Sequence, residues 1–388
     1  MPGGIEQVRR GRYFPGTYKR ADGVFTDAGP VCGVCLPAYE RALDEAHDGI
    51  STDCGSPGRI RSYVRGKLAD EVFVAESLRE NARKRIDYIL GGLGYFDFTE
   101  AEATVLRDFM IKGIDVAGES YSGDEGGLGV YGAMACFRDE TRTRKFLRAL
   151  FGGLAELESR SEKIEVVDAG CGPIPLFGAL AALKFSKVSA TCIEINESSA
   201  RIAESVVYNL GLSDRVKVVV GDAMKYTHNK PIDLLVSETM NSGLTEEPLL
   251  QIMQNLSPQV AQDGVVIPEW VSVDAGLVDL RGSDAYSNIF PDSAYIAPPV
   301  EVVRIGMRGQ ISDVVDFLLP IPRYKMLAHL AISSRVGLGC GGVLECRESV
   351  ITNPIVVCRN LHLDSGRKNV CVSYVAGAKR AAINAVVK

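Results

Sequence analysis

Hydrophobic and polar positions divide the chain into parts with different periodicities. Between residues 67 and 90, apolar residues recur at steps of three or four, which is the spacing of one face of an amphipathic helix. Two further helices are predicted over 37–49 and from 99 to about 118, where residues suited to helix ends frame the pattern. Residues 1–35 show little periodicity and are predicted to be irregular. We therefore expect a helical N-terminal domain over 1–118.

The pattern then changes to short apolar runs separated by helical segments, which is typical of a parallel, doubly wound sheet. The predicted strands are IEVVDAG at 164–170, SATCIEIN at 189–196, VKVVVGD at 216–222 and IDLLVSE at 232–238, and the predicted helices are PLFGALAALKF at 175–185 and SSARIAESVVYNLG at 198–211. These elements predict an α/β domain over 119–265. The polar, glycine-rich run at 119–129 predicts a linker or a mobile lid. After a turn predicted at DGVVIPEW, alternation of Val, Ile and Leu with polar residues predicts a β-rich domain over 266–388.

Composition excludes several classes of protein. The chain has 388 residues, of which 46% are hydrophobic and 24% charged, so disorder is excluded as its main state. With 43 Lys and Arg against 49 Asp and Glu, the net charge of −6 argues against nucleic acid or an anionic membrane as the main partner. No run of apolar residues is long enough to span a membrane, and no apolar signal core follows the first Met. We expect a cytoplasmic protein.

Ten cysteines are too few in a chain of this length for a disulfide scaffold. Cys32, Cys35, His47 and Cys54 could supply four zinc ligands, but the spacing contains one C-x-x-C pair only. Unconnected thiols and a surface histidine are the favoured interpretation, so we predict no metal. A basic run at 59–85 is likewise more typical of a solvated face than of a nucleic-acid platform.

The first predicted strand of the α/β domain ends in VVDAGCGPI, which places Asp168, Gly170 and Gly172 at its tip. Glycines at this position let the chain turn tightly into a helix and let a ligand approach the backbone. The register is not the G-x-G-x-x-G of a dinucleotide site, and Ile174 stands where a third glycine would be expected. The D-x-G-x-G pattern instead resembles motif I of class I S-adenosylmethionine (SAM) methyltransferases.

Acidic residues also end the next two strands. Glu194 is suited to accept hydrogen bonds from two ribose hydroxyls. Asp222, followed by Ala223, stands where the methyltransferases contact adenine. A solvated strand end is the alternative for each acid taken singly. Three matches at successive strand tips favour SAM as the cofactor, with S-adenosylhomocysteine as its product.

The fourth strand ends at Glu238, and Glu247 follows nine residues later in SETMNSGLTEEP. This pair resembles the double-glutamate loop of protein arginine methyltransferases, and FRDETRTRKFL at 137–147 and DGVVIPEW resemble other segments of that family. The resemblance covers roughly 128–388. It implies a Rossmann-like methyltransferase sheet, a C-terminal β-barrel, and Arg142 bound to the methionyl carboxylate of SAM.

The chemistry of a guanidinium explains why two acids are needed. Its five donors lie in one plane and its pKa exceeds 12, so it is a poor nucleophile unless its charge and orientation are held. Glu238 and Glu247 could clamp it from two sides, and one of them could accept the proton that is lost. For Glu246 and Glu247 the alternative is a helix N-terminus before Pro248, where acids are favourable.

Several positions depart from the arginine methyltransferase pattern. The loop SETMN lacks the Trp-Met-Gly of that family, and the nearest candidate for its Thr-His-Trp loop is Thr352-Asn353-Pro354, with Asn353 in place of His. The segment 270–320 is short for the helical arm through which the family dimerises, so we do not expect a homodimer to form through such an arm.

These departures, and the long N-terminal domain, favour a small guanidine such as free L-arginine as the acceptor. The chain is in this respect similar to the free-arginine methyltransferase of streptozotocin biosynthesis. Methylation of arginine in proteins, transfer of another group of SAM, and a non-catalytic SAM-binding scaffold are the alternatives.

Overall fold

The computed structural model describes residues 17–20, 23–26, 29–30, 128–136, 139–281, 290–308, 314–320, 326–363, 369–375 and 382–387. The helices and zinc ligands considered before residue 119 lie outside these ranges, as does most of the predicted linker. Within 1–35, the structure contains a small antiparallel sheet of β1 (Thr17–Arg20), β2 (Gly23–Thr26) and β3 (Gly29–Pro30). The prediction that this segment is irregular is therefore wrong for these strands, which are too short to show a period in the sequence.

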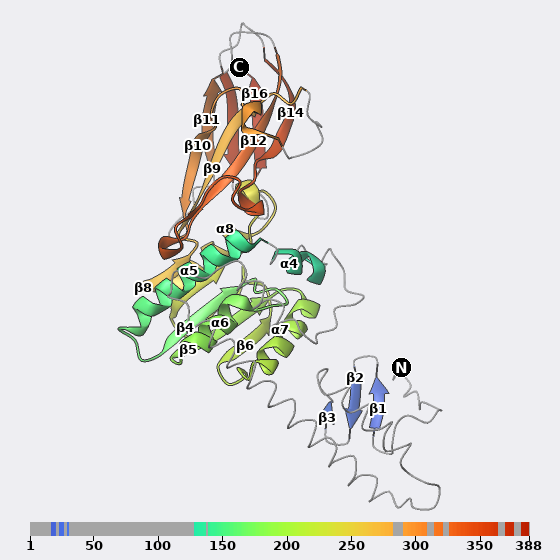
Figure 1. The fold of residues 1–388 in the computed structure, drawn as a ribbon, viewed down its shortest axis with the longest axis vertical. Coiled ribbons are helices and arrows are strands. Elements are labelled where there is room, and N and C mark those ends of the chain that lie inside the picture. Colours follow the sequence, from blue (N-terminus) through green and yellow to red (C-terminus); the bar gives the residue numbers. More distant parts are fainter. Residues whose placement is uncertain are drawn as a thin grey trace, which may run out of the picture.

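A five-stranded parallel sheet lies at the centre of the second part of the chain (Figure 1). Its order is β6-β5-β4-β7-β8, and all neighbouring strands are parallel. The strands are β4 (Ile164–Ala169), β5 (Val188–Glu194), β6 (Val216–Val220), β7 (Ile232–Ser237) and β8 (Val260–Ile267). The first four agree with the predicted runs to within two residues, which confirms the doubly wound α/β fold.

Strand β8 corrects the sequence analysis, which expected a turn at DGVVIPEW. The register between β7 and β8 shifts between Ile232 and Leu234, whose partners are Val260 and Val265. This irregularity contains Asp263 and Gly264, which are typical turn residues, and it conceals the strand in the sequence. The parallel sheet therefore extends to Ile267.

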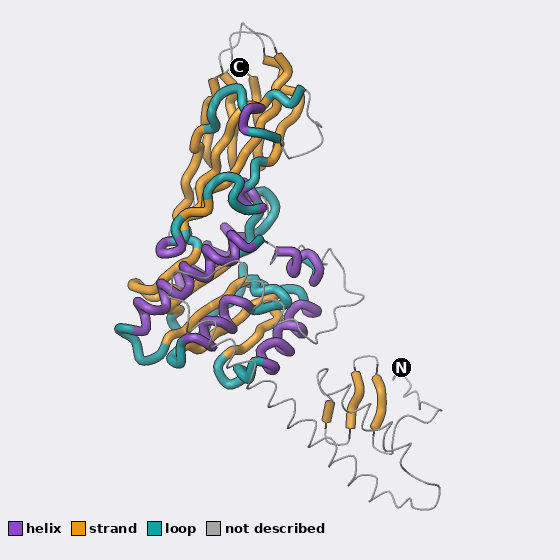
Figure 2. The backbone as a smooth tube through the Cα atoms, viewed as in Figure 1, coloured by secondary structure: helices purple, strands orange, loops and turns teal. Residues whose placement is uncertain are grey.

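Helices pack against the parallel sheet (Figure 2). Helices α6 (Leu176–Lys184) and α7 (Glu197–Asn209) connect and contact successive strands, and both confirm predicted helices. Helix α5 (Glu140–Glu158) packs on α6, β7 and β8 through an apolar face that includes Phe146, Leu150 and Leu154. Two shorter helices, α4 (Val130–Cys136) and α8 (Leu249–Leu256), stand close to the carboxyl ends of the strands. No helix of the described residues is both long and apolar enough to cross a membrane.

The C-terminal part consists of two antiparallel sheets, as the alternating sequence predicted (Figure 2). The first contains β9 (Trp270–Val278), β10 (Val300–Gly306), β12 (Met326–Gly337), β13 (Val343–Leu344) and β14 (Ile355–Leu363). The second contains β11 (Val314–Pro320), β15 (Asn369–Val375) and β16 (Ala382–Val387). Contacts between β14 and β16 and between β10 and β11 join the sheets into a barrel-like domain.

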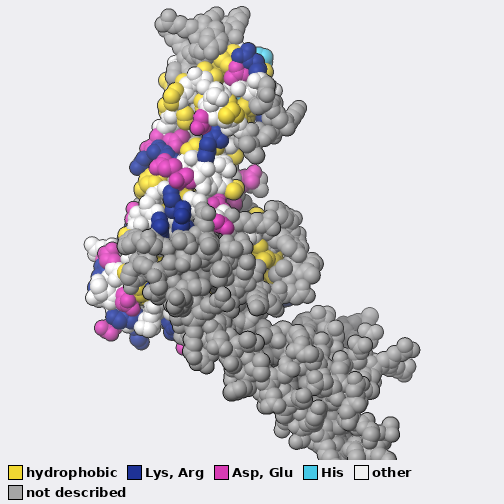
Figure 3. Space-filling view, in the orientation of Figure 1, with side chains coloured by type: hydrophobic (Ala, Val, Ile, Leu, Met, Phe, Trp, Pro, Cys, Tyr) yellow, Lys and Arg dark blue, Asp and Glu magenta, His cyan; other side chains and the backbone are white. Residues whose placement is uncertain are grey.

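This domain is attached to the parallel sheet through helix α5. The glycine-rich turn η5 (Gly339–Gly341) lies on α5, and a β-carbon at Gly341 would come within 2.3 Å of the carbonyl oxygen of Lys145. The Lys145 ammonium donates to the carbonyl of Val343 at 2.6 Å and pairs with Glu348 at 2.5 Å. On the face seen in Figure 3, acidic and basic side chains are interspersed over the described surface. The two domains therefore meet in close backbone contact beside the start of α5.

Candidate functional site

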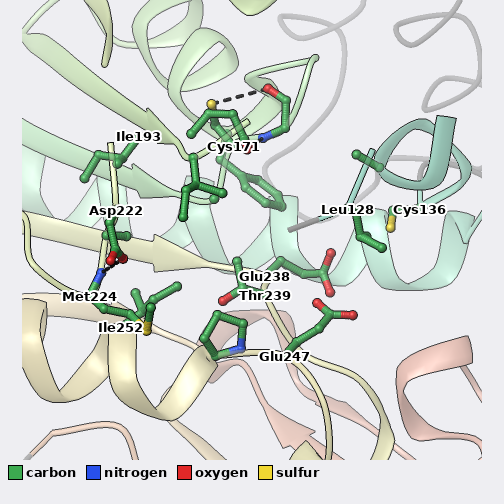
Figure 4. Close-up of a pocket in the computed structure, with 18 of the residues that line it drawn as sticks. Leu128, Cys136, Cys171, Ile193, Asp222, Met224, Glu238, Thr239, Glu247 and Ile252 are labelled. Carbon is green, nitrogen blue, oxygen red and sulfur yellow. Dashed lines mark hydrogen bonds between the residues drawn. The ribbon is translucent and has the colours of Figure 1, made fainter. Parts of the chain in front are cut away.

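A cavity of about 720 Å³ lies at the carboxyl ends of the parallel strands (Figure 4). It opens between β4 and β7, where the strand order changes direction, which is the usual ligand site of an open α/β sheet. The sequence-predicted residues that line it are Arg142, Gly170, Gly172, Glu194, Asp222, Ala223, Glu238 and Glu247. Asp168 does not line it. The fold thus brings together residues from five separate segments of the sequence, if the loop from Glu238 to Glu247 is counted as one.

The glycine loop after β4 presents backbone to this cavity. Gly170 and Gly172 have φ angles of +78° and +65°, which side-chain-bearing residues rarely adopt. A β-carbon at Gly170 would also come within 2.2 Å of the methyl carbon of Thr239. The predicted need for glycine at this tip therefore has two causes, the left-handed backbone and the close approach of the β7 loop.

Asp168 has a supporting position behind that loop. Its side chain is buried, and its Oδ2 atom accepts a hydrogen bond of 3.0 Å from the backbone N–H of Gly178 in the first turn of α6. Pro175, at the N-cap of α6, makes no side-chain hydrogen bond to the helix, so the Asp168 carboxylate caps the first turn instead. Burial raises the pKa of Asp168 to about 7. The carboxylate thus fixes α6 to the end of β4.

Glu194 and Asp222 face the cavity from the next two strand ends. The two oxygens of Glu194 accept the backbone N–H groups of Gly172 at 2.8 Å and Asn196 at 2.7 Å. Each oxygen keeps a lone pair for a further donor. Burial raises the pKa of Glu194. Asp222 accepts the backbone N–H of Met224 at 2.9 Å (Figure 4). It also pairs with Lys225.

Arg142 reaches into the same cavity from α5 and binds Glu238. Its Nη1 donates to Glu238 Oε1 at 3.0 Å, and its Nη2 donates to the carbonyl of Cys136 at 2.5 Å. Burial raises the pKa of Glu238 to about 7, with Arg142 acting in the opposite direction and Glu247 adding to the rise. Burial alone would lower the pKa of Arg142, but the Glu238 carboxylate raises it. The sequence did not reveal this ion pair, since its partners are 96 residues apart.

Glu247 lies opposite Glu238, with the two carboxylates turned toward one another (Figure 4). Burial raises the pKa of Glu247, again against the effect of Arg142. Helix α8 begins two residues later, and Pro248 at its N-cap makes no side-chain cap. Glu246 is exposed and Glu247 is half-buried, and both line the cavity. The arrangement places two carboxylates around a space into which a cation could enter.

A further acid, Asp139, was not predicted from the sequence as a site residue. Its Oδ1 accepts the backbone N–H of Arg142 at 3.1 Å, and its Oδ2 accepts Ser349 Oγ at 2.6 Å and the backbone N–H of Val350 at 2.8 Å. Ser349 stands 210 residues away, so no local pattern could indicate this contact. It holds the turn η6 (Val350–Thr352) against the start of α5.

The turn η6 belongs to the segment aligned with the Thr-His-Trp loop. Thr352 is buried in a capping box with Ser349, and Asn353 is exposed and does not line the cavity. In the described structure Asn353 therefore makes no contribution to the cavity wall.

Comparisons with known proteins give weak likenesses. No protein-family model matches the chain. An uncharacterized protein of Methanocaldococcus jannaschii, MJ1452, is 22% identical over 219 residues, which are 55% of this chain and 82% of that protein. Among solved structures, the Trypanosoma brucei PRMT1 enzyme-prozyme heterotetrameric complex with AdoHcy matches 66% of this chain and 96% of its own at 15% identity and a TM-score of 0.47. The PRMT6–SAH crystal structure matches 67% and 99% at 12% identity and a TM-score of 0.48. These values are too low to assign the chain to a family.

Proposed function

We propose that the protein is a SAM-dependent N-methyltransferase that acts on a guanidino group. The observation that carries this proposal is the placement of Glu238 and Glu247 opposite one another in the cavity that also contains the glycine loop. Glu238 already binds one guanidinium, that of Arg142, at 3.0 Å. The geometry of this carboxylate therefore suits pairing with a planar guanidinium donor.

The lining residues fit SAM. Both oxygens of Glu194 retain capacity for ribose hydroxyls, and Met224 and Ile252 offer an apolar surface beside Asp222 for an adenine ring. Arg142 uses its two terminal nitrogens in one hydrogen bond each and keeps further N–H donors for a carboxylate. Bound there, SAM would supply a methyl group on a sulfonium.

The two glutamates would orient the acceptor. A guanidinium held between Glu238 and Glu247 keeps its plane and its charge fixed, so that one nitrogen can face the methyl carbon. As the N–C bond forms and the S–C bond breaks, one N–H proton must leave. The raised pKa of Glu238 makes its carboxylate a better proton acceptor than an exposed glutamate.

We further propose a small acceptor, free L-arginine or a related guanidine of a natural-product pathway in the cytoplasm. Leu128, which precedes α4, and Ala133 and Cys136, which belong to α4, also line the cavity. The segment before α5 therefore forms part of the cavity wall. The volume of about 720 Å³ is of the size that holds small ligands. The resemblance to a free-arginine methyltransferase, drawn from the departures in the loops, supports the same choice.

The test is methyl transfer by the purified full-length protein with labelled SAM. Free L-arginine and an arginine-rich peptide serve as parallel acceptors, and mass spectrometry of the product identifies the group transferred. We expect methylated arginine from the free amino acid. Transfer to peptide alone would make the protein a protein arginine methyltransferase, and a heavier adduct would indicate transfer of another part of SAM.

A non-catalytic SAM-binding protein is the second candidate, and the Arg142–Glu238 ion pair is the observation that favours it. If Arg142 keeps this partner when the cofactor is bound, half of the acceptor clamp stays occupied. Calorimetric binding of SAM without transfer to any guanidine would support that function.

A further inference from the structure

The loop between the two glutamates is closed by one asparagine. The Asn241 side chain accepts the backbone N–H of Glu246 at 2.9 Å through Oδ1 and donates to Thr245 Oγ1 at 2.7 Å through Nδ2. Thr245 in turn donates to the carbonyl of Ser242. Because Glu246 immediately precedes Glu247, the Asn241 amide ties the backbone of the second acid to the loop that begins at the first.

The tip of the same loop is seated on the C-terminal domain. Ser334 of β12 is fully buried, and its Oγ accepts the backbone N–H of Gly243 at 2.7 Å. Gly243 has a φ angle of +69°, and a β-carbon there would come within 2.2 Å of Ile332 Cδ1. The loop therefore lies in direct contact with β12, without space for a side chain between them.

The beginning of the loop is tied to the parallel sheet instead. Ser237 Oγ donates to the carbonyl of Ala169 at 2.8 Å and shares a hydrogen bond of 2.9 Å with Thr239 Oγ1. Glu238 is thus fixed from the sheet that carries the glycine loop, whereas the path to Glu247 depends on Asn241 and on a side chain of the other domain.

We propose that Asn241 and Ser334 are positioning residues that set the separation and the orientation of Glu238 and Glu247. Neither lines the cavity, so neither touches the acceptor or the cofactor directly. The inference rests on the proposed methyl transfer. It predicts that changes at these two side chains lower the rate of methyl transfer to the acceptor. Cofactor binding should be retained, because the glycine loop, Glu194 and Asp222 are unchanged.

The experiment compares Asn241→Ala, Asn241→Asp and Ser334→Ala with the wild type and with Ser205→Ala. Ser205 bonds its own helix α7 on an exposed face, which makes it a matched control for a lost hydroxyl. We expect kcat/KM for the guanidine to fall between about fivefold and a hundredfold in the two alanine variants. The affinity for S-adenosylhomocysteine, measured by calorimetry, should stay within about threefold, which is less than one hydrogen bond contributes. Asn241→Asp keeps an acceptor for the Glu246 N–H and should lose less.

Amide hydrogen exchange of the full chain supplies a readout that does not depend on turnover. The Glu246 amide should exchange faster in Asn241→Ala and the Gly243 amide faster in Ser334→Ala, because each loses its acceptor. Unchanged turnover, unchanged exchange, or a loss of cofactor affinity parallel to the loss of kcat/KM would each overturn the inference. A wild type that binds cofactor but methylates no guanidine would overturn the proposed function instead, and the exchange rates would then decide the positioning role alone.

Discussion

Arg142 and Glu238 form an ion pair that is largely excluded from solvent, with side-chain exposures of 6% and 14%. A buried pair of this kind is strongly destabilised when one partner loses its charge, because the other charge is left without compensation. At this site the cost is moderated, since Arg142 also binds the Cys136 carbonyl and lies 3.8 Å from Asp139. Arg142 would therefore keep two partners if Glu238 also bound a second guanidinium, as proposed.

Glu238→Gln should separate catalysis from cofactor binding. The amide keeps the shape of the side chain but cannot hold a guanidinium by charge or accept the departing proton, so we expect methyl transfer to fall about 100-fold or more. Cofactor affinity should change only a few-fold. Radiolabel transfer and calorimetry measure the two quantities, with Glu156→Gln on the exposed face of α5 as the control. Equal turnover in Glu238→Gln and wild type would remove Glu238 from the mechanism.

The pH dependence of turnover should report the same carboxylate. Burial raises the pKa of Glu238 to about 7, so the group is protonated below this pH and ionised above it. A cationic acceptor needs the ionised form; kcat/KM should therefore rise between about pH 6 and pH 8 and then level off. The guanidinium itself does not titrate in this range. A profile that falls across the same interval would contradict the assignment.

At the scale of elements, the start of α5 connects the cavity to the C-terminal domain. One carboxylate, Asp139, caps the helix through the N–H of Arg142 and binds Ser349 and Val350 of the turn η6. The helix that carries the cavity arginine is thus held by a turn from the other domain. A substitution in this turn should therefore change the position of Arg142, although the turn itself does not line the cavity.

Asp139→Asn tests this connection. If the asparagine oxygen still caps α5, its amide nitrogen faces the two donors of η6 and can accept neither. The change also removes a negative charge near Arg142, so cofactor affinity should weaken about fivefold to fiftyfold. The Asp139 charge also contributes to the raised pKa of Glu238, so its removal should move the rise in kcat/KM to lower pH. Ser349→Ala keeps the charge and should leave the pH profile in place. A profile that shifts equally in both variants would rule out the electrostatic role.

At the scale of the whole molecule, the two domains contribute different parts of the site. The parallel sheet supplies the glycine loop and the strand-end acids, whereas β12 and η6 support the acid loop and the start of α5. Rossmann-like sheets bind ligands without such an addition, since their strand ends already form a crevice. The C-terminal domain therefore supports both the loop that carries Glu238 and Glu247 and the start of α5, which carries Arg142.

The glycine loop and the strand-end acids could be predicted from the sequence, whereas the support from β12 and η6 could not. Asp168, Glu194 and Glu238 each lie at the carboxyl end of a recognisable apolar strand, and parallel strands bring these ends to one edge. The contacts of Ser334 with Gly243 and of Ser349 with Asp139 join residues 91 and 210 positions apart. Such contacts depend on how two domains pack, which periodicity and spacing do not encode.

The packing of η5 on α5 gives a direct test of this interdomain support. At Gly341 a β-carbon would lie 2.3 Å from the Lys145 carbonyl and 3.0 Å from the Ala149 β-carbon, so Gly341→Ala must displace backbone. Overpacking of this kind costs about 1–3 kcal/mol, and we expect the free energy of unfolding to fall by that amount. Denaturant titration measures it, with Gly306→Ala as the control, because the nearest atom to a β-carbon at Gly306 is 3.8 Å away. Because the same domain supports the acid loop through β12 and the start of α5 through η6, both acceptor turnover and cofactor affinity should decline in Gly341→Ala. A variant with wild-type stability and turnover would show that the close contact between the domains does not set the geometry of the acid pair.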